Sequence, residues 1–82
     1  MSTAAQDSVP QTTPTAARIV VNGEPHTVGP NETLLRFIHF LQLDPERVAV
    51  EMNRRIIKRE LWPVTVLQEG TTLEIVQFVG GG

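Results

Sequence analysis

The residues with the clearest chemical potential stand at the end of the sequence, where a strand-like apolar segment runs directly into Gly80, Gly81 and Gly82. Glycine has no Cβ, so a run of it can enter a narrow channel and adopt backbone conformations that other residues avoid. A frayed end is the plain alternative, because disorder collects at chain termini. We predict instead a flexible glycine tail that presents the carboxyl group of Gly82 as the reactive group of the molecule.

Length and composition restrict the classes of function. The chain has 82 residues, no cysteine and a formal net charge of −2. A domain of this size encloses too little interior for a deep enzyme pocket, so we expect a carrier or binding protein and not an enzyme. The absence of cysteine excludes disulfides, thiolate metal sites and a cysteine nucleophile. The net negative charge argues against nucleic acid as a partner.

The sequence contains no signal for a membrane or a metal ion. No apolar run reaches membrane-spanning length, and the first residues do not resemble a signal peptide. We therefore expect a cytoplasmic protein that does not bind membranes. His26 and His39 have no second ligand or base at a suitable spacing, so we interpret both as structural and expect no metal site and no bound cofactor.

The folded domain is expected to span residues 18–82. Residues 1–17 consist mainly of Ser, Thr, Ala, Pro and Gln, and they show neither helical nor strand periodicity. Such a segment buries too little apolar surface to offset the entropy of ordering, so we predict a disordered N-terminal extension.

A hairpin and a helix open the predicted domain. Residues 18–28 predict a β-hairpin, since Asn22–Gly23 is a favoured two-residue turn, and Pro25 suits a second strand that lies at a sheet edge. A helix of about ten residues is predicted to begin at Asn31 or Thr33, which are good N-caps, and to end at Asp44–Pro45. Its apolar stripe consists of Leu34, Phe37, Ile38 and Leu41.

Further strands are predicted at residues 48–53, at Ile56–Ile57 and from Leu73 onward, with Arg54–Arg55 turning the chain. An amphipathic helix must cover its apolar stripe against another element. This order of elements therefore indicates an α+β domain, in which one helix packs across one face of a mixed sheet of four or five strands. Trp62 is interpreted as a lid over the small core.

Two groups of side chains are candidates for contact with a partner. Period-two alternation points Leu73 and Ile75 toward the helix and Glu74, Val76 and Phe78 away from it, so Val76 and Phe78 are predicted to form an exposed patch beside the tail. The second group consists of four basic residues that are close in sequence: Arg54, Arg55, Lys58 and Arg59. We interpret this group either as a solvated corner of the sheet or as a docking patch for an acidic partner surface.

These elements resemble the ubiquitin-like β-grasp sulfur carriers, above all the ThiS family of thiamine (thiazole) biosynthesis. The resemblance extends over residues 18–82. It depends on the order of the following segments: 48–53, 56–62, Gly70 with 73–76, and Gly81–Gly82. The sequence departs from the family in three places. Arg54 stands where the family usually has glycine, Thr71 where it usually has an acidic residue, and Gly80 adds a third glycine.

The resemblance implies a ubiquitin-like β-grasp fold and chemistry at Gly82. In such carriers an E1-like adenylyltransferase uses ATP to convert the terminal carboxylate to an acyl-adenylate. Sulfur from a donor such as a cysteine desulfurase then displaces AMP, and thiazole synthase takes the sulfur from the resulting thiocarboxylate. Residues Gly80, Gly81 and Gly82 would thread into the partner's channel, and ATP would be bound by the activating enzyme.

Three other functions stay open at this point. The related small subunit of molybdopterin synthase shares the fold and the terminal glycines. A ubiquitin-like modifier would be attached through Gly82 to lysines of other proteins. A plain β-grasp binding module would have an inert glycine end.

Overall fold

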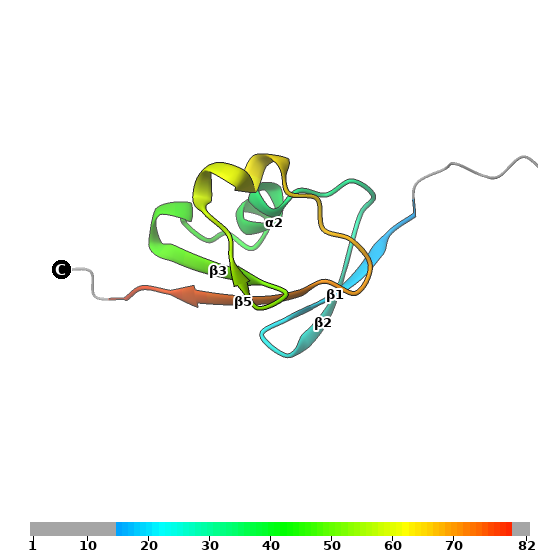
Figure 1. Ribbon diagram of the computed structural model, residues 1–82, viewed down its shortest axis with the longest axis horizontal. Helices are drawn as coiled ribbons and strands as arrows, with labels where there is room; N and C mark the ends of the chain where they lie inside the picture. Colours follow the sequence, from blue (N-terminus) through cyan, green and yellow to red (C-terminus); the bar gives the residue numbers. More distant parts are fainter. Residues whose placement is uncertain (1–14, 80–82) are drawn as a thin grey trace, which may run out of the picture.

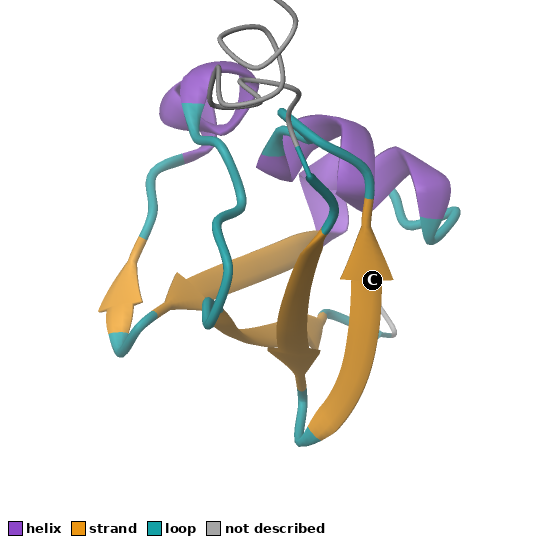
Figure 2. Cartoon of the chain, turned by 90° about the vertical axis from the view of Figure 1, so that its right-hand side faces the viewer, coloured by secondary structure: helices purple, strands orange, loops and turns teal. Residues whose placement is uncertain are grey.

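Five strands and one α-helix form the domain in the computed structural model, which describes residues 15–79 (Figure 1). The elements in chain order are β1 (Ala17–Val21), β2 (Glu24–Val28), α2 (Leu34–Phe40), the 3-10 helix η1 (Pro45–Arg47), β3 (Val48–Met52), β4 (Arg55–Ile56), the 3-10 helix η2 (Arg59–Val64) and β5 (Thr72–Gln77). The strands form one mixed sheet in the order β2-β1-β5-β3-β4. The helices lie on one side of this sheet (Figure 2). The predicted ubiquitin-like α+β fold is therefore confirmed.

The first hairpin has the predicted turn. Val21 pairs with Glu24, so Asn22 and Gly23 are the two turn residues, with φ of 49° and 85°. Strand β2 is an outer edge of the sheet, as the position of Pro25 indicated. Strand β1 begins at Ala17, which is only 7% exposed. The predicted boundary, which places Ala17 in the N-terminal extension of residues 1–17, is therefore wrong at this residue. Its small apolar side chain completes the buried period-two face of β1. The rest of the predicted extension up to residue 14 lies outside the described residues.

The helix starts as predicted but ends earlier. Thr33 is the N-cap, and its side chain accepts a hydrogen bond from the N–H of Arg36 at 3.2 Å. The helix stops after seven residues because Gln42 adopts a left-handed φ of 62°. The N–H of Gln42 then donates to the carbonyl of His39, and the N–H of Leu43 to that of Ile38. This pair of bonds is a Schellman motif, which usually has glycine at the left-handed position.

The core lies between the sheet and the helices. It contains Leu34, Phe37 and Ile38 from α2, together with the inward-facing residues of β1, β3 and β5. Trp62 is 1% exposed, and its indole N–H donates to the carbonyl of Ile57 at 2.9 Å. This partner satisfies the polar atom of a large buried aromatic side chain. Trp62 is thus part of the core interior rather than an outer lid.

The turn between β3 and β4 is shifted by one residue from its predicted place. Met52 pairs with Arg55, so the turn residues are Asn53 and Arg54, and the short strand is Arg55–Ile56. Both turn residues have positive φ, 52° for Asn53 and 72° for Arg54. Asparagine tolerates this conformation, which favours the observed turn, whereas arginine adopts it at a cost. The turn was predicted one residue too late because Asn53 was assigned to the end of the preceding strand.

Candidate functional site

Strand β5, which leads to the terminal glycines, lies at the centre of the sheet. It pairs antiparallel with β3 along its length, from Met52 opposite Leu73 to Val48 opposite Gln77. On its other side it pairs parallel with β1, but only at Thr72 and Leu73. Figure 1 shows β5 continuing past the β1–β2 hairpin toward the C-terminus. The segment before the glycines is therefore held by the domain and not appended to its surface.

Two turn asparagines add further bonds to β5. The side-chain amide of Asn22 accepts from the N–H of Ile75 at 2.7 Å and donates to its carbonyl at 3.2 Å. The Oδ1 of Asn53 accepts from the N–H of Thr72 at 2.9 Å. The sequence marked both asparagines as turn formers, but it gave no sign that their side chains reach a strand so distant in the chain. They fix β5 at its start and near its middle.

The two faces of β5 are oriented as predicted. Leu73 is buried and Ile75 packs against the core, whereas Val76 and Phe78 are 57% and 51% exposed. The last described residue, Val79, is 84% exposed. The glycines Gly80, Gly81 and Gly82, on which we placed the tail and the reactive carboxyl group, lie outside the described residues.

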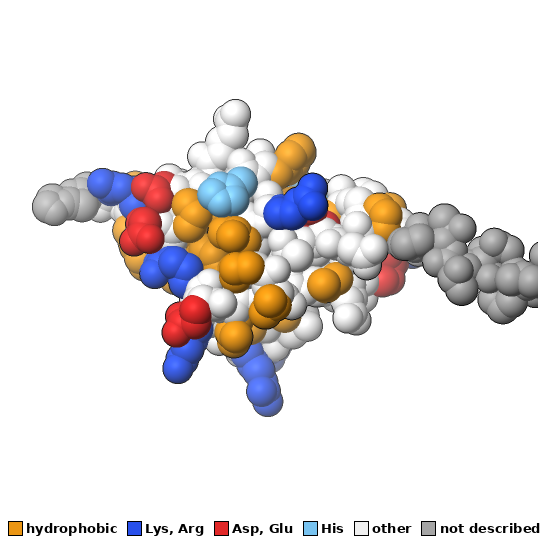
Figure 3. Space-filling view, turned by 90° about the horizontal axis from the view of Figure 1, so that it is seen from above, with side chains coloured by type: hydrophobic (Ala, Val, Ile, Leu, Met, Phe, Trp, Pro, Cys, Tyr) orange, Lys and Arg blue, Asp and Glu red, His pale blue; other side chains and the backbone are white. Residues whose placement is uncertain are grey.

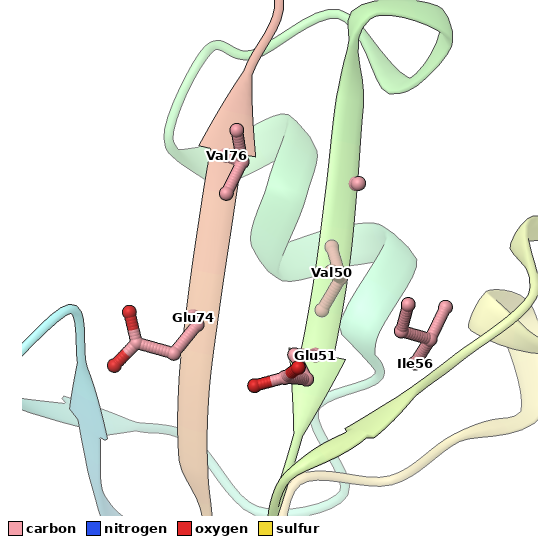
Figure 4. A pocket seen from close by; sticks show the side chains of 6 residues that line it. Val50, Glu51, Ile56, Glu74 and Val76 are labelled. Carbon is pink, nitrogen blue, oxygen red and sulfur yellow. The ribbon is translucent and has the colours of Figure 1, made fainter.

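A shallow hollow lies on the uncovered face of the sheet, between β3, β4 and β5 (Figure 4). Its lining residues are Ala49, Val50, Glu51, Ile56, Glu74 and Val76. Glu51 and Glu74 are directly opposite each other in the β3–β5 ladder. Like charges in this arrangement repel. This face therefore combines exposed apolar side chains with negative charge, beside the strand that leads to the tail.

The four basic residues of the second predicted group do not form one patch. Arg54 and Arg55 lie at the β3–β4 turn, beside the start of β5. Lys58 and Arg59 line a second hollow together with Phe78, near the end of β5. The Nε of Arg59 donates to the carbonyl of Pro45 at 2.8 Å, and its guanidinium carbon lies 5.5 Å from the centre of the Trp62 ring. Arg59 thus has a structural role in addition to any role in docking.

The opposite, helix-bearing side of the molecule carries scattered charges between exposed apolar side chains (Figure 3). Phe40 of α2 and Leu61 and Val64 of η2 are exposed. His26 makes an edge-on contact with the ring of Phe37 at 5.9 Å, in agreement with a structural role. Within the described residues no group of acidic or histidine side chains is placed to hold a metal ion. No helix in this part of the chain is long and apolar enough to cross a membrane.

An ion pair closes the turn that precedes β5. The carboxylate of Glu69 accepts from the backbone N–H of Arg18 at 2.8 Å and from its Nε at 2.9 Å. The backbone hydrogen bond first, and then the bond from the guanidinium, hold the pKa of Glu69 below its usual value. Both side chains are largely exposed, so this pair contributes little to the free energy of unfolding.

The sequence was compared with known protein families, and the family model described as the ThiS family matches residues 16–82. A thiazole synthase of Magnetococcus marinus is 42% identical over 65 residues, which are 79% of this chain and 20% of that protein. A thiazole synthase of Paramagnetospirillum magneticum is 34% identical over the same shares. The chain therefore spans about a fifth of the length of these two relatives. A protein named ycf40 from Pyropia yezoensis is 36% identical over 90% of its own length.

Two solved structures of a thiamine biosynthesis protein (ThiS) from Geobacter metallireducens have the same fold. The crystal structure superimposes with a TM-score of 0.67 at 32% sequence identity, covering 79% of this chain and 99% of that one. The solution structure gives a TM-score of 0.64 at 32% identity, with 79% and 87% covered. The domain therefore has the fold of this thiamine biosynthesis protein.

Proposed function

The chain belongs to the ThiS family, and we propose on that basis that it is a sulfur carrier protein of thiamine biosynthesis. The likeness to a thiamine biosynthesis protein over nearly all of that protein's length supports this proposal. In this role the chain is a co-substrate of other enzymes and not an enzyme itself. Its small core agrees with such a role, since the proposed chemistry requires no catalytic pocket in the carrier itself.

The proposed chemistry takes place at the carboxyl group of Gly82. A carboxylate is a poor electrophile, so a partner adenylyltransferase first attaches it to AMP, consuming ATP and releasing pyrophosphate. The persulfide sulfur of a donor such as a cysteine desulfurase then displaces AMP to form an acyl disulfide. A second thiol reduces the S–S bond and leaves a thiocarboxylate. Thiazole synthase takes this sulfur for the thiazole ring and the carboxylate is regenerated. Because glycine has no side chain, the carbonyl carbon of Gly82 is open to attack from both sides.

The observation that carries this proposal is the anchoring of β5. Strand β5 is bonded to β3 along its length and to both turn asparagines, and its last residue, Gln77, stands five residues before Gly82 in the sequence. A carrier must place its reactive end in the active site of another protein without unfolding its own domain. A central strand that leads out of the sheet meets this requirement, because its direction is fixed by the core.

We assign the contact surface for the activating enzyme to the end of β5. Val76 and Phe78 are exposed on the open face, and Lys58 and Arg59 lie near Phe78. Arg54 and Arg55 lie at the other end of the β3–β5 pair and form a separate basic surface, so they would contact a different part of the same partner or another partner. The two thiazole synthases that contain a region similar to this chain support thiazole synthase as the acceptor of sulfur.

The test is ATP–pyrophosphate exchange with the activating enzyme, followed by intact mass analysis of the carrier. We expect exchange that depends on the carrier, and a product in which one oxygen is replaced by sulfur. Gly82→Ala should abolish most of the exchange without changing the unfolding temperature. Gly29→Ala is the matched control, since an added Cβ there meets no atom within 4 Å. Normal exchange by a variant lacking Gly81 and Gly82 would refute the proposal.

Growth experiments separate the carrier from its alternatives. Rescue of thiamine-requiring cells supports the proposed role, whereas rescue of molybdoenzyme-deficient cells would indicate the small subunit of molybdopterin synthase. A ladder of larger species that survives thiols and denaturant would indicate a protein modifier attached through Gly82.

A further inference from the structure

The two edges of β5 differ in how far they are paired. Toward β3, the strand is bonded as far as Phe78, whose N–H donates to the carbonyl of Arg47 at 2.7 Å. Toward β1, the pairing covers only Thr72 and Leu73. The side-chain amide of Asn22 then forms hydrogen bonds with both the N–H and the C=O of Ile75. Beyond Ile75, no strand of the described chain lies against this edge, as the upper part of β5 in Figure 4 illustrates.

The alternation of the backbone identifies the groups on this open edge. The N–H of Ile75 points toward Asn22, and the N–H of Phe78 points toward β3. Successive residues of a strand direct their N–H and C=O groups to opposite edges. Gln77 and Val79 therefore share the orientation of Ile75, and their N–H and C=O groups face the open edge. These groups lie immediately before the glycines.

The outer edges of the sheet are protected against pairing, and the open edge of β5 is not. Strand β2 carries Pro25, which lies opposite Val20 of β1. The N–H of Val20 donates to the carbonyl of Thr71, on the side of β5, so this pair is not hydrogen-bonded and the nitrogen of Pro25 faces away from β1. Strand β4 has only two residues and begins with Arg55. Short length, proline and charge are the usual means by which proteins block edge pairing. The segment 77–79 contains neither proline nor charge.

We propose that the enzyme that activates Gly82 binds this edge with an extended segment of its own chain, which forms main-chain hydrogen bonds with Gln77 and Val79 and adds a strand to the sheet where β1 ends. This inference rests on the proposed function. In strand addition the main chain supplies affinity and alternate side chains supply specificity. The added segment would also place its side chains beside Val76 and Phe78, which are exposed on the open face.

The pairing would hold the chain extended directly before the tail. Gln77 already belongs to a strand, so the partner does not have to order it. The added hydrogen bonds would fix the direction in which Gly80 to Gly82 enter the partner. Strand addition therefore couples recognition of the domain to placement of the reactive end.

A proline substitution tests this inference at a single backbone atom. Gln77→Pro removes the N–H on the open edge and fills its place with the ring, while the bond from Phe78 to Arg47 is untouched. Pro25 in β2 shows the same arrangement, a proline whose nitrogen faces away from the neighbouring strand. We expect the variant to fold and the KM for the carrier in ATP–pyrophosphate exchange to rise about two- to tenfold, as for the loss of one main-chain hydrogen bond. Gln77→Ala is the matched control and should leave KM unchanged.

A second variant covers the case in which the proline disturbs the strand. Replacing the amide between Val76 and Gln77 by an ester, through semisynthesis, removes the N–H without adding a ring and weakens the Val76 carbonyl as an acceptor toward β3. It should raise KM without a change in the circular dichroism spectrum. A folded variant of either kind with the KM of the original protein overturns the inference, and the proposed function then stands because exchange still occurs. If the original protein is a dimer that Gln77→Pro converts to a monomer with unchanged KM, the edge binds a second copy and the inference is also wrong. Absence of exchange with the original protein would refute the proposed function itself.

Discussion

Arg54 provides the sharpest test of backbone strain in the turn between β3 and β4. It is the second residue of the turn between β3 and β4, and its φ of 72° lies in the left-handed region. For a residue with a Cβ this conformation costs about 1–2 kcal/mol. Glycine adopts it freely but loses about 0.5–1 kcal/mol more conformational entropy on folding. We therefore expect Arg54→Gly to raise the free energy of unfolding by about 0.5–1 kcal/mol.

Thermal unfolding followed by circular dichroism measures this change. For a domain of this size each kcal/mol shifts the midpoint by about 4–8 °C, so a rise of about 2–8 °C is expected. Arg54→Ala is the control for charge, because it removes the guanidinium and keeps the strained backbone. It should leave the midpoint nearly unchanged. If alanine stabilises the protein as much as glycine does, repulsion between Arg54 and Arg55 is the cause and the strain argument is refuted.

The neighbouring turn residue should respond in the opposite direction. Asn53 also has positive φ, but its Oδ1 accepts hydrogen bonds from the N–H of Thr72 at 2.9 Å and from its hydroxyl at 3.3 Å. Asn53→Gly retains the backbone conformation and removes both bonds, so it should lower the free energy of unfolding by about 1 kcal/mol. Two glycine substitutions one residue apart thus have opposite predicted signs.

Three further measurements address the elements around β5. Asn22→Gly keeps the left-handed turn and removes the amide that bonds to β5, so it should lower the free energy of unfolding by about 1–2 kcal/mol in urea titration. The lowered pKa of Glu69 means that its ion pair stabilises the fold above about pH 4.5 and that this stabilisation is lost as the pH falls through the folded pKa. Unfolding of Glu69→Gln should therefore depend less on pH below 4.5 than that of the original protein. Val76→Ser should raise the KM for the activating enzyme with little effect on the unfolding midpoint, whereas Val64→Ser, exposed on the helix side, should change neither.

Local chemistry predicted much of the fold. The Asn22–Gly23 turn, the N-cap at Thr33 and the period-two face of β5 each depend on neighbours within a few residues, so the sequence alone indicated them. The helix end at Gln42 was missed because glutamine occupies a position where glycine is the usual signal. The turn at Asn53–Arg54 was predicted one residue too late because Asn53 was assigned to the preceding strand, whereas the pairing of Met52 with Arg55 makes Asn53 the first turn residue.

The features that matter most for the proposed site depend on long-range register and were not visible in the sequence. The side chains of Asn22 and Asn53 meet β5 only because the sheet places their turns at its side. The division of the basic residues into two surfaces likewise follows from the direction of β3, which separates the β3–β4 turn from the end of β5 by the length of the strand. These basic residues are close together in the sequence, and only the fold shows that they lie on two different surfaces.

The arrangement of β5 combines two requirements that oppose each other. A strand that presents a reactive end must be rigid enough to direct it. Hydrogen bonds on both edges provide this rigidity from Thr72 to Ile75, where the side-chain amide of Asn22 continues the pairing with β1. A strand that a partner recognises through its backbone must keep one edge unpaired, and the early end of β1 leaves that edge free at Gln77. Val21 lies opposite Leu73, so β1 would have to be four residues longer to reach Gln77, and such an extension would close this edge to a partner. The short β1 and the amide of Asn22 therefore determine where anchoring stops and recognition begins.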